Sequence, residues 1–334
     1  MTIRFATIGL MHNHMYSLTN QLIEAGAELL AVYEPDPALR EPYTAQYPQA
    51  RVVDDEAAIL QDDRVQLVIS APLGDQRADL GVRVMQAGKD YLTDKPGFTT
   101  LAQLEEARRV QAVTGRIFYV YYSERFANPA SVKAGELVQA GAIGDVIQVV
   151  GFGPHKMNPT QRPAWFFRRV HVGGILNDLA CHQADQFLFY TGSTEASVVS
   201  AQVGNFHHPQ YPELEDYGDM LLRSDRATGF FRVDWLTPAG LETWGDVRLL
   251  LLGTEGTIEV RKNIDLAGRP GANHLFLIDQ QGTHYFDFQD VPMPFGEQVV
   301  QDVLNRTETA MSQAHCFLAS ELALKAQAMA HRLR

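Results

Sequence analysis

The stretch FATIGLMHNHMYSLTNQLIEAGAELLAVYEPDP, residues 5–37, decides the fold. It reads as an apolar strand, a glycine turn at Gly9, a helix, a second apolar strand and then an acid, Glu34. This order is that of a nucleotide-binding β-α-β unit, which ordinarily carries G-x-G-x-x-G at the turn. Here Met11 and His14 stand at the second and third glycine positions. The stretch therefore predicts the fold and leaves open whether a dinucleotide site is kept or given up.

Short apolar segments alternate with helical patterns through the first part of the chain. Strands are expected at 3–9, 28–34, 65–72, 90–96 and 116–122, and helices at about 16–25, 75–88 and 101–115. Such alternation is typical of a parallel sheet covered by helices on both faces. The sequence therefore predicts a doubly wound Rossmann domain over residues 1–122.

The pattern changes in the second part of the chain. A helix is expected at 129–140, a strand at 144–153, a helix near 175–190, longer strands at 196–206, 216–224, 227–236, 246–253 and 256–263, and a terminal helix at about 309–333. Tight Gly, Asp and Asn turns between those strands indicate an antiparallel sheet. The fold class is therefore α/β, with a C-terminal α+β domain over 123–334 that we expect to bind substrate and form oligomers.

Composition excludes several classes of function. The 334 residues suit about two domains, and 46% are hydrophobic, which is enough for two cores. A net charge of −12 opposes binding to nucleic acid. We expect no membrane span, because no apolar run approaches the roughly 20 residues needed, and no secretory signal. Two cysteines, Cys181 and Cys316, suit a reducing cytoplasm.

The three glycine positions of a dinucleotide site have different structural roles. The first glycine makes the tight turn, the second lets backbone approach the pyrophosphate, and the third lets the helix pack closely. Gly9 keeps the first job, whereas Met11 and His14 place large side chains at the other two positions. The helix N-terminus still offers N–H groups and a positive dipole end to phosphate. His12 or His14 can add a donor.

Glu34 stands where an acid commonly holds the ribose of the cofactor. It ends the second strand about 25 residues after Gly9, near the expected spacing. No arginine follows to meet a 2′-phosphate, because Pro35 and Asp36 come next. This favours NAD over NADP, although a solvated acid at a strand end would read the same way.

The pair His12 and His14 also admits a metal site. The two imidazoles flank one residue at the turn into the helix. A metal site needs three or four ligands, and no nearby residue offers an evident third. The sequence therefore predicts no metal ion here.

A second group of motifs carries acid–base chemistry. YLTDKPGFTT, residues 91–100, places Lys95 at the carboxyl edge of the predicted sheet, where ligands bind in open α/β folds. VGGILNDLACHQADQFLFYTG, residues 172–192, places Asp178 and His182 at i and i+4 on a predicted helix. An aspartate beside a histidine orients the ring and raises its basicity. The alternatives are a surface turn and an ordinary polar helix face.

Together these motifs resemble the glucose–fructose oxidoreductase / inositol dehydrogenase / MocA family over nearly the whole chain. The family signatures E-K-P, G-G-G-x-x-x-D-x-x-x-H and Y-R-F-x-P correspond here to Asp94-Lys95-Pro96, to Gly173-Gly174-Ile175 with Asp178 and His182, and to Arg125-Phe126 with Pro129. The departures are Met11 and His14 in the glycine loop, Gln76 where the family often has histidine, and Asp94 for glutamate.

The resemblance implies an NAD(P)-dependent oxidoreductase that acts on a sugar, polyol or related hydroxy or carbonyl compound. It implies that Lys95 holds the substrate hydroxyl, that His182 takes its proton, and that Asp178 orients or assists. The implied cofactor contacts are Gly9, Met11, His12, His14, Glu34, Ala71, Pro72 and Lys95. The implied substrate contacts are Arg125, His155, Trp165, Arg168 and Asn177.

Two other classes of function stay open. A non-catalytic dinucleotide- or sugar-binding regulatory protein would explain GLMHNH, but gives no chemical reason for Lys95, Asp178 and His182 to occur together. A metal-dependent lyase or hydrolase is the third hypothesis. The open second sheet needs a partner surface, so we expect a homodimer or homotetramer through it, as the resemblance also implies.

Overall fold

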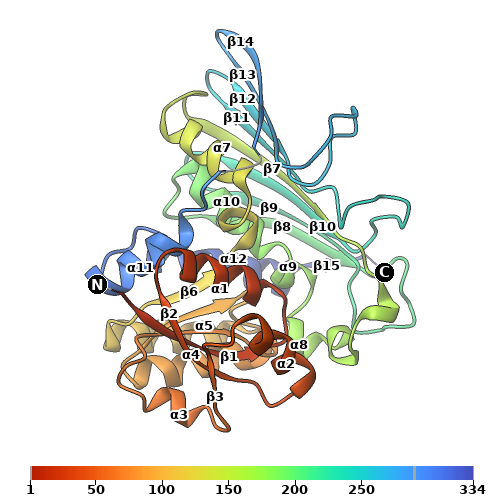
Figure 1. Ribbon diagram of the computed structural model, residues 1–334. Helices are drawn as coiled ribbons and strands as arrows, with labels where there is room; N and C mark the ends of the chain where they lie inside the picture. The colour runs from red at the N-terminus through yellow and green to blue at the C-terminus, as the bar shows by residue number, and fades with distance from the viewer. Residues whose placement is uncertain (1, 289–290, 334) are drawn as a thin grey trace. The chain divides into compact units, whose positions relative to one another are not determined.

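The computed structural model describes residues 2–288 and 291–333, and their contacts divide it into two compact units (Figure 1). The first unit comprises Met1–Tyr122 and Met293–Phe317, and the second comprises Ser123–Pro292 and Leu318–Arg334. Both units are thus discontinuous in sequence, whereas the sequence analysis assigns everything after residue 122 to one domain.

The first unit is built on a parallel sheet of six strands in the order β3-β2-β1-β4-β5-β6. The strands are β1 Arg4–Leu10, β2 Glu28–Tyr33, β3 Arg51–Val52, β4 Leu67–Ala71, β5 Asp90–Asp94 and β6 Phe118–Tyr121. This confirms the predicted doubly wound fold. The strand order reverses between β1 and β4, and ligands bind at the carboxyl ends of the strands at such a point.

The helices of the first unit are α1 His14–Glu24, α2 Pro37–Gln46, α3 Ala57–Leu60, α4 Gly74–Gln86, α5 Leu101–Thr114 and α11 Phe295–Asn305. Helix α2 was not expected from the sequence, although the Asp36 side chain accepts a hydrogen bond from the N–H of Ala38 and Pro37 occupies the first helical position. Helix α11, which packs against α1, was not expected either. Helix α1 begins two residues earlier than expected.

The second unit is built on a mixed, largely antiparallel sheet of nine strands in the order β14-β13-β12-β11-β7-β10-β9-β8-β15. The strands are β7 Val146–Pro154, β8 Ser197–Gly204, β9 Tyr217–Arg223, β10 Thr228–Asp234, β11 Arg248–Gly253, β12 Thr257–Arg261, β13 His274–Asp279, β14 Gly282–Asp287 and β15 His331–Arg332. Among the described strands of this sheet, only β7 with β10 and β8 with β15 pair in parallel. The predicted open sheet is confirmed, but β13 and β14 were not expected.

One face of this sheet is covered and the other is open. Helices α7 Pro129–Gln139 and α10 Cys181–Thr191 contact the sheet (Figure 1). Along β11, Leu249 and Leu251 are 3% and 1% exposed, whereas Leu250 and Leu252 are 37% and 41% exposed. Successive side chains of a strand alternate between faces, so the open face carries apolar side chains.

The remaining helices of the second unit differ from expectation. They are α6 Ser123–Phe126, η1 Pro159–Gln161, η2 Ala164–Phe167, α8 Arg169–Val172 and α9 Ile175–Asp178, and α12 Gln313–Met329 contributes residues to both units. The helix predicted near 175–190 is broken between α9 and α10. Among the residues that the structure describes, no helix is long and apolar enough to cross a membrane.

Candidate cofactor and catalytic site

A cavity of about 670 Å³ lies at the carboxyl ends of β1, β2 and β4 in the first unit. Ligands of doubly wound folds bind at this position. Its lining residues are Ile8, Gly9, Met11, Tyr33, Glu34, Pro35, Asp36, Glu56, Pro72, Leu73, Asp75, Gln76, Asp79, Leu80 and Arg83. The structure thus brings four of the predicted cofactor residues together, namely Gly9, Met11, Glu34 and Pro72.

Gly9 makes a turn that no other residue fits. Its φ is +79°, and a Cβ on it would lie 2.8 Å from the backbone nitrogen of Pro72. The pairing of β1 with β4 shifts register between Ile8 and Leu10, at this glycine. Close approach of two backbones and a left-handed φ both require glycine.

Glu34 holds the loop that follows Gly9. Its carboxylate accepts hydrogen bonds from the N–H of Leu10 at 2.7 Å and from the N–H of Asp36 at 2.9 Å, and the residue is buried. The next N–H, of Met11, donates to the carbonyl of Ala71 at 2.8 Å. Sequence reasoning gave Glu34 a ribose contact only. Its role in fixing the loop depends on backbone donors that sequence does not reveal.

The N-terminus of α1 has fewer open donors than the sequence suggests. The N–H of His14 donates to Nδ1 of His12 at 3.2 Å, and the N–H of Met15 donates to the carbonyl of His12. The backbone N–H groups of His12 and Asn13 make no hydrogen bond within the part of the chain that the structure describes. Two donors therefore remain for a phosphate at the helix start.

The charges that line the cavity are mostly negative. Its acids are Glu34, Asp36, Glu56, Asp75 and Asp79, and its cation is Arg83. Arg83 is paired with Glu56 at 2.9 Å, so its charge is partly balanced within the cavity wall. A phosphate group placed beside these carboxylates, in addition to one at the start of α1, would be repelled.

His12 and His14 turn toward a residue that sequence reasoning did not connect with them. Nδ1 of His14 lies 2.8 Å from Oδ1 of Asp94, and Nδ1 of His12 lies 3.3 Å from Oδ2. Asp94 ends β5, 80 positions after His14, and is fully buried. The inference that no third ligand accompanies the two histidines was wrong, because strand pairing brings Asp94 to them.

The cluster of His12, His14 and Asp94 has perturbed acidities. Burial raises the pKa of Asp94, but His12, His14 and Arg77 outweigh it and hold that pKa well below its usual range. Burial lowers the pKa of His12, and the neighbouring His14 lowers it further, so the His12 ring is neutral near pH 7. Asp94 is therefore an anion beside a neutral imidazole.

Lys95 directly follows this cluster and is buried. The chain around it is held by Arg77, whose guanidinium donates to the carbonyls of Pro72, Asp94, Lys95 and Pro96. The lysine is therefore carried on a fixed segment at the carboxyl edge of the sheet, as its position after the strand predicted.

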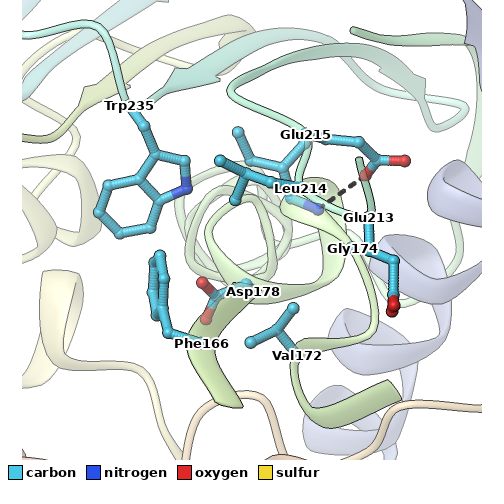
Figure 2. A pocket seen from close by; sticks show the side chains of 9 residues that line it. Phe166, Val172, Gly174, Asp178, Glu213, Leu214, Glu215 and Trp235 are labelled. Carbon is cyan, nitrogen blue, oxygen red and sulfur yellow. Dashed lines mark hydrogen bonds between the residues drawn. The ribbon is translucent and has the colours of Figure 1, made fainter. Parts of the chain in front are cut away.

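Asp178 and His182 belong to two helices and not to one. Asp178 ends α9 and His182 lies in the first turn of α10, so the expected shared face of a single helix is wrong. Both residues are buried. The Asp178 carboxylate faces the rings of Phe166 and Trp235 in a cavity of about 10 Å³ (Figure 2). That volume suits roughly one water molecule.

Glu124 is a buried carboxylate that sequence reasoning missed. It accepts a hydrogen bond from Nζ of Lys262 at 2.8 Å. Burial raises the pKa of Glu124, but Lys262, then His182 and His155, lower it to about 2. Glu124 is therefore an ionised group whose field acts on His182. Its partner lies 138 positions away, so no local pattern pointed to it.

Arg125, an expected substrate contact, is committed to the protein interior. Its guanidinium makes two hydrogen bonds to Asp185, at 2.8 and 2.6 Å. It also lies 3.9 Å from the ring centre of Phe126 and 4.6 Å from that of Phe189. This placement ties α6 to α10 and gives Arg125 a structural contact where a substrate contact was expected.

The other expected substrate contacts all belong to the second unit, and ring contacts through Trp235 and Phe166 connect His155 to Trp165. Nδ1 of His155 lies 3.0 Å from the carbonyl oxygen of Gly153, and Nδ2 of Asn177 donates to the carbonyl of Val172. The exposed Arg168 pairs with Glu213 at 2.8 Å, and Trp165 is partly exposed.

Sequence reasoning also missed an aromatic group around Arg162. The guanidinium lies 4.4 Å from the ring centre of Phe166, 5.0 Å from Trp235 and 5.1 Å from Trp244. Burial lowers the pKa of Arg162, and Asp178 raises it. Arg162 is thus a cation that interacts electrostatically with Asp178.

A doubly wound sheet with a cavity at its switch point, together with an open mixed sheet, is the architecture of a two-domain α/β protein that binds a ligand at the carboxyl ends of its parallel strands. Residues 3–122 match the family described as "Oxidoreductase family, NAD-binding Rossmann fold", and residues 131–259 match the "GFO/IDH/MocA C-terminal domain". The chain belongs to this oxidoreductase family. The resemblance drawn from the motifs is confirmed, and so are the predictions of an oxidoreductase and of a nicotinamide dinucleotide cofactor.

Individual relatives agree in fold and class. A protein of Erwinia carotovora atroseptica SCRI1043 described as an oxidoreductase is 46% identical, with a TM-score of 0.96 over 99% of this chain and 100% of its own. Scyllo-inositol 2-dehydrogenase (NAD(+)) of Bacillus subtilis is 26% identical over 88% of this chain and 82% of its own length. A Sinorhizobium meliloti 1021 protein described as a myo-inositol dehydrogenase, 20% identical, shares the fold, with a TM-score of 0.77 and coverage of 98% and 97%.

Proposed function

We propose that this chain is an NAD-dependent dehydrogenase that oxidises a hydroxyl group of a cyclic polyol or sugar. The observation that carries the proposal is the cavity at the carboxyl ends of β1, β2 and β4, within a domain of the NAD-binding family. The similarity to a scyllo-inositol dehydrogenase over 88% of the chain supports the substrate class. The first unit binds the cofactor, and the second binds the substrate.

The residues around the cavity fit a dinucleotide. Gly9 and Pro72 bring two backbones together, and the N–H groups of His12 and Asn13 are open to a pyrophosphate at the start of α1. Met11 lines the cavity without filling it. When bound, NAD supplies the hydride acceptor, and the protein supplies orientation and proton transfer.

The charges at the cavity favour NAD over NADP. The 2′-phosphate of NADP would meet carboxylates such as Glu34 and Asp79, while Arg83 is committed to Glu56. Glu34 can accept a ribose hydroxyl in addition to its backbone donors, because each carboxylate oxygen has a second lone pair. The 2′-hydroxyl of NAD therefore fits where a phosphate would not.

We assign the acid–base work to Lys95, Asp178 and His182, as the family signatures imply. Hydride departure leaves the substrate hydroxyl with a proton to lose, which His182 accepts. The Lys95 ammonium stabilises the negative charge that develops on that oxygen. Glu124, whose pKa of about 2 keeps it charged at neutral pH, interacts electrostatically with His182 and balances the positive charge that the ring gains when it takes the proton. The remaining proposed substrate contacts are His155, Trp165, Arg168 and Asn177.

The experiment is a test of NADH formation with scyllo-inositol, myo-inositol and D-xylose. We expect turnover with at least one of them, and its loss in Lys95→Met and His182→Ala. Lys133→Met, at a surface ion pair on α7, is the matched control and should keep activity. A protein that binds NADH but turns over no polyol or sugar would contradict the proposal.

A non-catalytic binding protein on the same fold is the alternative. The observation that favours it is the loop after Gly9, where Leu10, Met11 and His14 have their N–H groups bonded within the protein. NADH binding without turnover would support this alternative. If the protein bound neither NADH nor NADPH, the alternative would be limited to a non-catalytic sugar-binding protein.

We propose a homodimer or homotetramer formed through the open face of the nine-stranded sheet. Side chains that pair across strands point to the same face, so exposed Phe230, Leu250 and Tyr285 lie in one row across it. Exposed apolar area of this kind usually meets a partner. Light scattering should give a multiple of 37.2 kDa, reduced by Leu250→Glu and not by the control Leu266→Glu. A monomer would contradict this.

We propose a cytoplasmic location for the enzyme. The 334 residues include two cysteines, Cys181 and Cys316, and both are buried, as expected of a protein from a reducing compartment. Cell fractionation that recovers the protein outside the cytoplasmic fraction would contradict this.

A further inference from the structure

His12, His14 and Asp94 have the composition and spacing of a metal site. Their candidate ligand atoms all lie within 4.8 Å of one another, with two separations of 2.8 and 3.3 Å. Two ligands at about 2.0–2.1 Å from a tetrahedral Zn²⁺ lie roughly 3.3 Å apart. An ion therefore fits after shifts of a few tenths of an ångström.

The hydrogen bonds leave two acceptors facing each other. Nδ1 of His12 accepts from the N–H of His14, so it carries a lone pair and cannot donate to Oδ2 of Asp94, 3.3 Å away. Oδ2 of Asp94 finds no hydrogen-bond partner among the described residues, although Asp94 is fully buried. A buried carboxylate oxygen without a donor is costly, and a cation between the two acceptors removes that cost.

The cluster is reachable from solvent, and the cations Arg77 and Lys95 act electrostatically on it. The side chains of His12 and His14 are 34% and 28% exposed, so an ion has an entry path. Nη2 of Arg77 lies 3.5 Å from Oδ2 of Asp94, but its Nη1 and Nε donate to backbone carbonyls such as that of Pro72. Arg77 balances the carboxylate charge from one side and lies beyond hydrogen-bond distance of Oδ2.

We propose that His12, His14 and Asp94 bind a divalent transition-metal ion of the Zn²⁺ class. Two imidazoles and one carboxylate suit Zn²⁺, Co²⁺ and Ni²⁺ better than Mg²⁺ or Ca²⁺, which prefer oxygen ligands. Three protein ligands leave one position open to water or to an anionic oxygen. This site goes beyond the proposed dehydrogenase function, whose hydride and proton transfers need no metal.

The test uses the full chain after treatment with a chelator. Zn²⁺ is titrated by calorimetry and Co²⁺ by its visible absorption, which is intense only in low-coordinate sites. We expect one ion per chain. His12→Ala and His14→Ala should each weaken binding by more than about 100-fold, because even changes outside the ligand shell cost about 10–100-fold.

The matched control is His284→Ala, which removes a histidine from an exposed pair with Asp279 and should leave metal binding unchanged. Circular dichroism checks that each variant is folded. We expect the substitutions to be tolerated, because the histidines are partly exposed. Absence of stoichiometric metal binding by the wild type would overturn the proposal. Metal affinity as high in His12→Ala and His14→Ala as in the wild type would overturn it too. NADH affinity is measured on the same samples, so failure of the metal site and failure of the cofactor site are distinguished.

Discussion

The two units leave very different amounts of space at their predicted site residues. The cavity beside Gly9 and Glu34 measures about 670 Å³, whereas the cavity beside Asp178 measures about 10 Å³ and is closed by Phe166 and Trp235. The first can receive part of a dinucleotide and the second roughly one water. The cofactor half of the site is therefore preformed within its own unit, while the side chains around Asp178 fill the space themselves.

The difference also lies in what builds each region. Backbone features make the first, namely the left-handed Gly9, the adjacent Pro72 and the open N–H groups of α1. Long-range side-chain contacts make the second, such as Arg162 over Trp235. Backbone features belong to the fold and serve any member of the family. Side-chain contacts belong to this chain, and we expect substrate choice to depend on them.

The largest expected effect separates chemistry from cofactor binding. Lys95→Met keeps the buried volume but removes the ammonium to which we assign stabilisation of the negative charge that develops on the substrate oxygen. We expect kcat to fall by about 100- to 1000-fold, as for loss of one oxyanion donor. Steady-state kinetics with parallel NADH titrations measure this. A fall in kcat below about tenfold would remove Lys95 from the catalytic set.

The next effect tests the preformed cavity itself. Gly9→Ala puts a Cβ 2.8 Å from the nitrogen of Pro72 at a φ of +79°. We expect the free energy of unfolding to drop by about 1–3 kcal/mol and NADH binding to weaken by more than about tenfold. Gly240→Ala is the control, because nothing lies within 4 Å of its added Cβ. Equal behaviour of the two variants would mean that the turn is not required.

A smaller effect tests the packed region of the second unit. Trp235→Phe shortens a ring that covers Arg162 and closes the cavity beside Asp178. We expect KM for the polyol or sugar to change by roughly threefold to tenfold, at a cost of about 1 kcal/mol or more in stability, with NADH affinity unchanged. If NADH affinity changed and KM did not, the assignment of cofactor and substrate to separate units would fail.

The smallest effect concerns pH. The pKa of His12 is lowered well below 6.5 by burial and by His14, so the folded ring stays neutral while the unfolded ring takes up a proton. Stability must then fall as the pH drops below about 6.5. Because 34% of the side chain is exposed, the loss is smaller than the about 1.4 kcal/mol per pH unit of a fully buried group. The free energy of unfolding is measured by urea titration of chelator-treated protein at several pH values. In His12→Gln it should fall less steeply with decreasing pH than in the wild type, and the same pH dependence in both would contradict this.

Local sequence patterns predicted the main elements of the fold and missed several of its helices and strands. Periodicity and turn residues gave the β-α-β unit of residues 5–37, the doubly wound sheet and the open second sheet. They missed α2, α11, β13 and β14, and joined α9 to α10 across a break at residues 179–180. A break of two residues does not alter a helical pattern enough to be recognised.

The site was predicted in part for the same reason. Gly9, Glu34 and Lys95 stand next to local signals, at the ends of strands. Asp94 meets His14 over 80 positions and Glu124 meets Lys262 over 138, so only tertiary structure pairs them. Arg125 stood in a recognised motif, but its distant partner Asp185 decides its role.

Calorimetric titration of the purified protein with NADH and, separately, NADPH tests the central claim most directly, after a check that no cofactor has co-purified. We expect micromolar NADH binding, NADPH binding weaker by at least about tenfold, and a loss of NADH affinity of about 10- to 100-fold in Glu34→Ala. Absence of binding by both cofactors, or tighter binding of NADPH, would contradict a preformed NAD site beside Gly9 and Glu34.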